Sequence, residues 1–190
     1  MKVIAFNGSA REKGNTYYLL NKVLDQLKKA SIETKLIHLG NHPVQGCKAC
    51  YKCKENKNNR CVLKDDPMND YIKEMQEADG ILLGSPTYCA NVSTNMQAFL
   101  ERAAFVSRAN KDIFKYKVGA GVVAVRRCGG TAVFSTLNKF FLITQMIVPG
   151  SSYWNVGFGL NPGDVKNDEE AMRTMIDLGD NMAWLLKKLM

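Results

Sequence analysis

The sequence lacks the segments that would place it in or across a membrane. No apolar run approaches the ~20 residues that a membrane-spanning helix needs. The amino terminus offers only the short apolar run 3–6 before Asn7, which is far shorter than the apolar core of a signal peptide. We therefore expect a cytoplasmic protein with no membrane partner.

Nucleic-acid recognition signatures are also missing. The formal net charge is +8, but no recognition helix, zinc finger or aromatic RNA-binding pattern accompanies it. We interpret the excess as solvated surface charge and expect no nucleic-acid partner. The hydrophobic fraction of 46% and charged fraction of 23% are typical of a globular protein. A length of 190 residues suits one domain spanning 1–190.

Strand and helix patterns alternate along the chain. The expected strands are 2–6, 33–39, 80–85, 117–125 and 146–148. The expected helices start at Asn15 or Thr16, at Asp66, after Ser93, near Thr131 and near Asp168. This alternation predicts an α/β fold with a parallel sheet covered on both faces. Five strands fit the flavodoxin-like doubly wound order 2-1-3-4-5, with a cysteine-rich loop (about 43–65) inserted after strand 2.

The loop at residues 8–16 follows the first strand and leads into a helix. Its small and hydroxyl residues expose backbone N–H groups at the positive end of the helix dipole, which favours an anion. Ser9, Asn15 and Thr16 would add side-chain donors, and Arg11 a positive charge. The loop has neither the G-x-G-x-x-G nor the G-K-[ST] pattern, so the terminal monophosphate of FMN is the better match. An ordinary capped turn is the alternative.

Two further loops are expected at the same sheet edge, because the carboxyl ends of parallel strands lie together. Residues 86–93 form a proline-stiffened loop whose aromatic side chain and backbone amides could wrap the edge of a planar ring. In the loop 126–131, Arg126 and Arg127 could stabilise negative charge on a reduced flavin. Gly129 and Gly130 would allow close backbone approach. Simple connecting loops are the alternative.

Four of the six cysteines have the spacing C-x2-C-x2-C-x7-C: Cys47, Cys50, Cys53 and Cys61. A disulfide framework is not expected, because cytosolic thiols are kept reduced. Three closely spaced thiolates with Cys61 as fourth ligand favour an iron-sulfur cubane. A structural zinc site is the rival, and four free thiols are the remaining alternative. Cys89 and Cys128 are interpreted as packed residues.

The segments GSAREKGNT, SPTYCANVS before MQAFLER, and RRCGG resemble the flavin motifs of the NADPH-dependent FMN reductase group within the flavodoxin superfamily. The resemblance covers nearly the whole chain. It implies a phosphate site at Ser9, Arg11, Asn15 and Thr16. For the ring and ribityl chain it implies Pro86, Thr87, Tyr88, Asn91 and Val92, with Gly129 and Gly130 matching the third loop. The chain departs from the group at Cys89, where an aromatic or bulky residue is common.

The cysteine motif is similar to that of the iron-sulfur flavoproteins, a branch of the same superfamily. That resemblance implies a [4Fe-4S] cluster on the four cysteines and a homodimer or homotetramer. It also implies an FMN-dependent oxidoreductase passing electrons between a reduced carrier, such as ferredoxin or NAD(P)H, and an acceptor. Two alternatives remain: a cluster-free NAD(P)H-dependent FMN or quinone reductase, and a non-enzymatic flavodoxin-like carrier.

Overall fold

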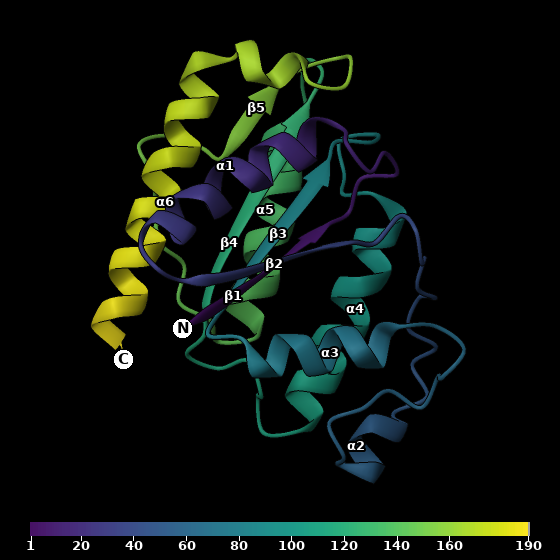
Figure 1. Ribbon diagram of the computed structural model, residues 1–190. Helices are drawn as coiled ribbons and strands as arrows, with labels where there is room; N and C mark the ends of the chain where they lie inside the picture. Colours follow the sequence, from purple (N-terminus) through teal and green to yellow (C-terminus); the bar gives the residue numbers. More distant parts are fainter. Residues whose placement is uncertain (190) are drawn as a thin grey trace.

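The computed structural model describes residues 1–189 and contains a parallel sheet between two helical layers (Figure 1). The strands are β1 (Lys2–Asn7), β2 (Glu33–His38), β3 (Gly80–Pro86), β4 (Val118–Val125) and β5 (Val156–Phe158). The helices are α1 (Asn15–Lys29), α2 (Lys52–Asn56), α3 (Met68–Glu77), α4 (Thr94–Ala109), α5 (Gly130–Ile143) and α6 (Glu169–Leu189), with a 3-10 turn η1 (Asp164–Asn167).

The sheet order is β2-β1-β3-β4-β5 and every strand pair is parallel, which confirms the predicted fold. The strands β1, β3 and β4 are almost wholly apolar and buried because helices cover both of their faces. Helices α1 and α6 pack on one face, and α3, α4 and α5 supply the core of the other. None of the helices described in residues 1–189 is both long and apolar enough to span a membrane.

The predicted position of the fifth strand is wrong. Residues 146–148 make only an isolated bridge, between Ile147 and Val118, at the start of β4. The chain then leaves the sheet at Pro149, which has no N–H to donate. It returns at Val156–Phe158, which pairs with the last residues of β4. The aromatic residues Tyr153 and Trp154 therefore lie just before β5.

Side-chain hydrogen bonds mark the starts of α4 and α3. The Ser93 hydroxyl accepts from the N–H of Met96 at 3.3 Å, as expected of an N-cap. A carboxylate oxygen of Asp66 accepts from the N–H of Met68 at 3.2 Å at the start of α3. α1 starts at Asn15, as expected, but neither Asn15 nor Thr16 caps it, because Gly14 holds the N-cap position. Both side chains are directed to the cavity described below.

The cysteine segment lies outside the sheet, beside α3 and α4, and contains the short helix α2 (Figure 1). It is attached to the rest of the fold by a buried ion pair between Arg102 of α4 and Asp66. Burial alone would raise the pKa of Asp66, but hydrogen bonds from Arg102 and from the backbone N–H of Gln45 outweigh it. They hold the pKa below its ordinary value.

Replacing Asp66 by Asn should destabilise the fold at neutral pH, because the Arg102 charge is left buried without a counterion. We expect a loss of about 3–5 kcal/mol in the free energy of unfolding. A carboxyl with a lowered folded pKa contributes stability above its unfolded pKa and loses that contribution as pH falls through the folded value. The two proteins should therefore converge below the ordinary pKa of 3.8. Denaturant unfolding at neutral and acidic pH measures the stability of both proteins. A stability difference that does not change with pH would contradict the assigned role of the Asp66–Arg102 ion pair.

Candidate functional site

A cavity of about 280 Å³ lies where β1, β3 and β4 end. Its lining comes from each of the loops that the sequence predicted to share a ligand, and from the residues after β5. These residues are Ser9, Arg11, Gly14, Asn15 and Thr16, then Pro86, Thr87 and Tyr88, then Ala124, Val125 and Arg126, and finally Gly159 and Leu160. The three loops therefore meet in one cavity, as expected from the topology.

The strand register explains why the loops meet. Asn7 at the end of β1 lies opposite Gly84 of β3, and Pro86 lies opposite Ala124 of β4. The pairing continues into the loops, because the N–H of Gly8 donates to the carbonyl of Gly84 at 2.8 Å and that of Thr87 donates to Ala124 at 2.8 Å. The loops consequently leave the sheet at nearly the same level.

Two buried threonine hydroxyls in this cavity have no hydrogen-bond partner. They are the Oγ1 atoms of Thr16, whose side chain is in the first turn of α1, and of Thr87. A buried hydroxyl without a partner costs about 1–3 kcal/mol, so their retention points to a ligand that supplies acceptors. The first-turn N–H groups of α1 face the same end, where the helix dipole favours an anion. The arrangement suits a phosphate near Thr16.

Ser9 and Asn15 also line the cavity, but their side chains are partly engaged within the protein. The Ser9 hydroxyl accepts from the N–H of Arg11 at 3.0 Å, which leaves its proton available to a ligand. The side-chain oxygen of Asn15 accepts from the N–H groups of Gly163 at 2.9 Å and Val165 at 3.3 Å. Asn15 therefore ties the segment after β5 to the first loop and has only its amide nitrogen left for a ligand.

His38 braces the first loop from β2. Its Nε2 donates to the carbonyl of Ser9 at 2.7 Å, while its Nδ1 is buried without a partner. This contact connects the imidazole directly to the first loop.

The second loop turns tightly between Tyr88 and Asn91, which exchange backbone hydrogen bonds of 3.0 and 2.9 Å. Cys89 and Ala90 at the corner are left-handed, with φ of 50° and 55°, which is uncommon for residues with a Cβ. Cys89 and Cys128 are both exposed, so their interpretation as packed residues is wrong. Tyr88 lines the cavity and is half exposed. Asn91 instead bonds the adjacent N–H of Val92, and the Val92 side chain is in the core. Neither Asn91 nor Val92 lines the cavity, so the contacts of these two residues with a flavin stay a prediction.

The residues of the third loop line two different pockets. Arg126 lines the 280 Å³ cavity, whereas Arg127, Gly129 and Gly130 line an adjoining pocket of about 330 Å³ beside α6. Gly129 has φ of 84°, and a Cβ there would lie 2.9 Å from that of Ala90, so the glycine lets the second and third loops pack together. The contact of Arg127 with a flavin also stays a prediction.

Gly159 and Leu160 are cavity residues that the sequence reasoning missed. They follow β5 directly and reach the edge where the other loops lie. The signal was present, because the residues after any strand of a parallel sheet reach the same edge. Because the fifth strand was predicted at residues 146–148 instead of at β5, this rule pointed to the wrong residues.

The four cysteines share one segment, with Cys50 exposed and Cys47, Cys53 and Cys61 partly buried. Burial raises the pKa of Cys53, backbone hydrogen bonds oppose that rise, and the thiols of Cys61 and Cys47 add a smaller increase. Within residues 1–189 no three metal-ligating side chains converge into a closed metal site. The donor set fits a thiolate-bound metal, since the cysteines are the soft ligands of the segment.

The backbone around these cysteines is unusual. Ala49, Tyr51, Lys57 and Asn59 are left-handed, with φ between 47° and 59°. Residues with a Cβ adopt this conformation less readily than glycine, although asparagine tolerates it and turns elsewhere in the chain, such as those at Ser31 and Lys111, also contain it. The thiol of Cys47 already accepts a backbone hydrogen bond from Ala49 at 3.4 Å. The segment thus has the tight turns and N–H···S contact expected of a thiolate-rich metal loop.

Comparison with known proteins identifies the family. The sequence profile of the NADPH-dependent FMN reductase family matches residues 1–161. The chain belongs to this family. It is 37% identical to an iron-sulfur flavoprotein of Methanocaldococcus jannaschii over 196 aligned positions, covering 98% of each chain. It is 29% identical to an iron-sulfur flavoprotein of Methanosarcina thermophila, covering 98% of this chain and 96% of that protein.

Solved structures agree on the fold of this FMN reductase family member. RosB with a bound riboflavin-phosphate intermediate superposes with a TM-score of 0.76 at 16% identity, covering all of this chain and 80% of RosB. A flavodoxin from Archaea gives a TM-score of 0.64 at 16% identity, covering 98% and 99% of the two chains. The predictions of a flavodoxin-like fold and a flavin-dependent oxidoreductase with an electron-transfer role are confirmed.

Replacing Thr16 by Val should weaken FMN binding by removing a hydrogen bond to a charged phosphate. We expect a loss of about 1.5–3 kcal/mol, roughly 10- to 150-fold in Kd, without loss of apoprotein stability. Flavin fluorescence titration of the apoprotein measures the affinity. Thr136→Val is the matched control, because that hydroxyl bonds the Ala132 carbonyl on the exposed side of α5. Equal affinities for the wild type and Thr16→Val would contradict the assignment.

Proposed function

We propose that this chain is an iron-sulfur flavoprotein with FMN in the cavity at the sheet edge and a [4Fe-4S] cluster on Cys47, Cys50, Cys53 and Cys61. It passes electrons between a reduced carrier and an acceptor. The observation that carries the flavin assignment is the pair of unpartnered buried hydroxyls, Thr16 and Thr87, inside one cavity formed by three loops. When bound, FMN supplies two-electron and one-electron chemistry, and the cluster supplies single-electron transfer.

The residues of the cavity divide between the two ends of FMN. Ser9, Arg11 and Thr16 hold the phosphate together with the first-turn N–H groups of α1, and the amide nitrogen of Asn15 is a further donor. Pro86, Thr87 and Tyr88 of the second loop contact the ribityl chain and ring. Arg126 places a positive charge beside the cofactor. Asn91, Val92, Arg127, Gly129 and Gly130 remain proposed contacts of the ring's far end.

The cluster assignment rests on the four cysteines and on relatives that match nearly the full chain and are iron-sulfur flavoproteins. The protein's own contribution is to fix the thiols and offset their charge. The basic residues of the segment are Lys48, Lys52, Lys54, Lys57, Arg60 and Lys64. Each reduces the net negative charge that four thiolates would bring.

The position of the cysteine segment supports an oligomer. The thiol of Cys53 contacts the carbonyl of Phe105 late in α4 at 3.9 Å, whereas the FMN cavity adjoins the loop before α4. The helix from Thr94 to Phe105 rises about 17 Å, and α2 lies toward the end opposite the tips of β3 and β4 (Figure 1). A cytoplasmic homodimer or homotetramer would bring the cluster of one subunit near the FMN of another.

The face that we assign to contact with such a copy is apolar. A groove of about 620 Å³ runs between α4 and α5, and Leu142 and Ile143 at its rim are 66% and 50% exposed. Large exposed apolar side chains grouped in one groove are typical of interaction surfaces. This groove is therefore the surface we assign to self-association.

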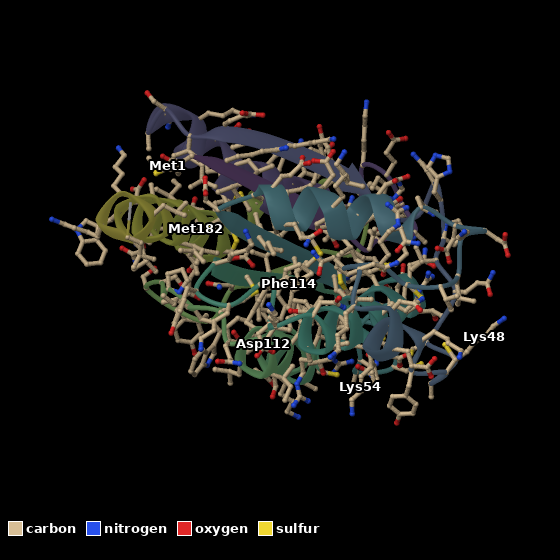
Figure 2. All side chains as sticks on the ribbon, turned by 90° about the horizontal axis from the view of Figure 1, so that it is seen from below. Met1, Lys48, Lys54, Asp112, Phe114 and Met182 are labelled. Carbon is tan, nitrogen blue, oxygen red and sulfur yellow. The ribbon has the colours of Figure 1, made fainter. Side chains whose placement is uncertain are left out.

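The basic face near the cluster suits an acidic electron carrier such as ferredoxin. A pocket of about 560 Å³ is lined by Lys54, Lys57, Arg108, Tyr51 and Cys53 among others. Figure 2 shows Lys54 and Lys48 extending outward from this end of the molecule. Opposite charge accelerates association of such partners and is screened by salt. NAD(P)H is the alternative donor, as the family description names NADPH.

Anaerobic purification tests the cluster directly. We expect flavin absorption bands with a broad iron-sulfur shoulder, and iron and sulfide in equal amounts. Cys53→Ala should lose the iron and keep the FMN, while Cys128→Ala, outside the motif, should keep both. Zinc in place of iron would contradict the cluster assignment, and so would flavin bands alone with rapid bleaching by NADPH. Either result would favour the cluster-free NAD(P)H-dependent FMN or quinone reductase.

Charge reversal tests the carrier. Lys54→Glu combined with Lys57→Glu should slow reduction by reduced ferredoxin about 10-fold or more at low salt, and the difference should shrink as salt is added. Reduction by dithionite, which needs no docking, should be unaffected. The same reversal at Lys187 and Lys188, in the last turn of α6, is the control. A ferredoxin rate insensitive to both changes would contradict docking at this face.

A further inference from the structure

A single buried arginine joins the two ends of the cysteine segment. Arg102 of α4 is 1% exposed. Its Nη1 donates to the carbonyl of Gln45 at 3.3 Å and pairs with Asp66, and its Nη2 donates to the carbonyl of Leu63 at 3.3 Å. Gln45 comes just before Cys47, and Leu63 just after Cys61. One guanidinium group therefore closes the loop that carries all four cysteines.

Neighbouring side chains complete this closure. Asp66 also accepts from the N–H of Gln45 at 2.9 Å. Asn69 of α3, which is buried, accepts from the N–H of Cys61 at 2.7 Å and donates to the carbonyls of Cys61 and Leu63, each at 3.0 Å. The backbone of Cys61 is thus held on both its polar groups by one amide side chain. The ends of the loop are fixed from α3 and α4, which are rigid elements of the fold.

This arrangement is a poor way to gain stability. Two charges are taken out of water, and the Nε of Arg102 is buried without a partner. Burying an ion pair often contributes no more than apolar residues of the same size would. What the pair does provide is geometry, because the planar guanidinium can bond two carbonyls and a carboxylate at fixed angles.

We propose that Arg102, together with Asn69, is a positioning residue that holds the two ends of the cysteine segment together, next to Cys47 and next to Cys61, so that the four thiols can gather around one metal. The proposal rests on the metal-binding function proposed above. It does not depend on whether the metal is an iron-sulfur cluster or zinc, because either needs the two ends of the segment brought together. Residues outside the ligand set that orient the ligands change metal affinity by roughly 10- to 100-fold when replaced.

Cobalt(II) titration of the full chain tests the proposal. The FMN-loaded protein is stripped of other metal under anaerobic, reducing conditions, and Co²⁺ alone is added. Its absorption bands report how many thiolates bind. The wild type should bind one Co²⁺ with a four-thiolate spectrum. Arg102→Lys keeps a charge beside Asp66 but cannot bond both carbonyls, and it should bind Co²⁺ roughly 10- to 100-fold more weakly with its FMN content unchanged.

A matched control separates positioning from general destabilisation. Phe99, one turn earlier on α4, is fully buried against Phe6 and Tyr71. Phe99→Leu should lower the melting temperature without touching the cysteine segment, and it should keep wild-type Co²⁺ affinity. If Arg102→Lys does not fold, Asn69→Asp takes its place, because it preserves the shape of Asn69 and removes the N–H donors to Cys61 and Leu63.

The outcomes are distinct. Wild-type Co²⁺ affinity in the folded Arg102→Lys or Asn69→Asp protein would overturn the positioning role. Equal losses of affinity in Arg102→Lys and Phe99→Leu would overturn it as well, by reducing Arg102 to a stability residue. A wild-type protein that forms no four-thiolate cobalt complex would instead remove the proposed metal site itself, and the positioning role with it.

Discussion

The parallel register of β1, β3 and β4 is the constraint on which the proposed flavin site depends. It sets Asn7 beside Gly84, and Pro86 beside Ala124, so the loops that follow start at one level of one sheet edge. Each loop alone resembles an ordinary connector. Together they enclose a cavity in which Thr16 and Thr87 leave buried hydroxyls without partners. The fold therefore leaves two hydroxyl groups without hydrogen-bond partners at the place where a bound FMN would supply acceptors.

The cysteine segment obeys a different constraint, because it lies outside the sheet. Its left-handed residues and exposed lysines contribute little to stability, and the attachments come from Arg102, Asn69 and Asp66 on neighbouring elements. The segment is fixed at its ends. A loop held in this way is suited to presenting thiols to a metal.

Much of this fold could be predicted from local patterns, since alternating strands and helices allow few topologies and Ser93 is a recognisable cap. β5 could not, because three residues interrupted by a glycine carry too short a pattern. The sequence also could not separate Arg126 from Arg127, because both follow β4 directly, and only Arg126 lines the cavity. The partners of Asn15 and Arg102 lie far away in sequence, so only the folded chain shows that these residues act as ties.

The most direct test of the account is a crystal structure of the protein with FMN bound. The phosphate should lie at the start of α1, with an oxygen about 3 Å from the Thr16 hydroxyl, and the Thr87 hydroxyl should bond the cofactor. A phosphate seated instead in the adjoining pocket beside Gly130 and α6, with both threonine hydroxyls still unpartnered, would contradict it.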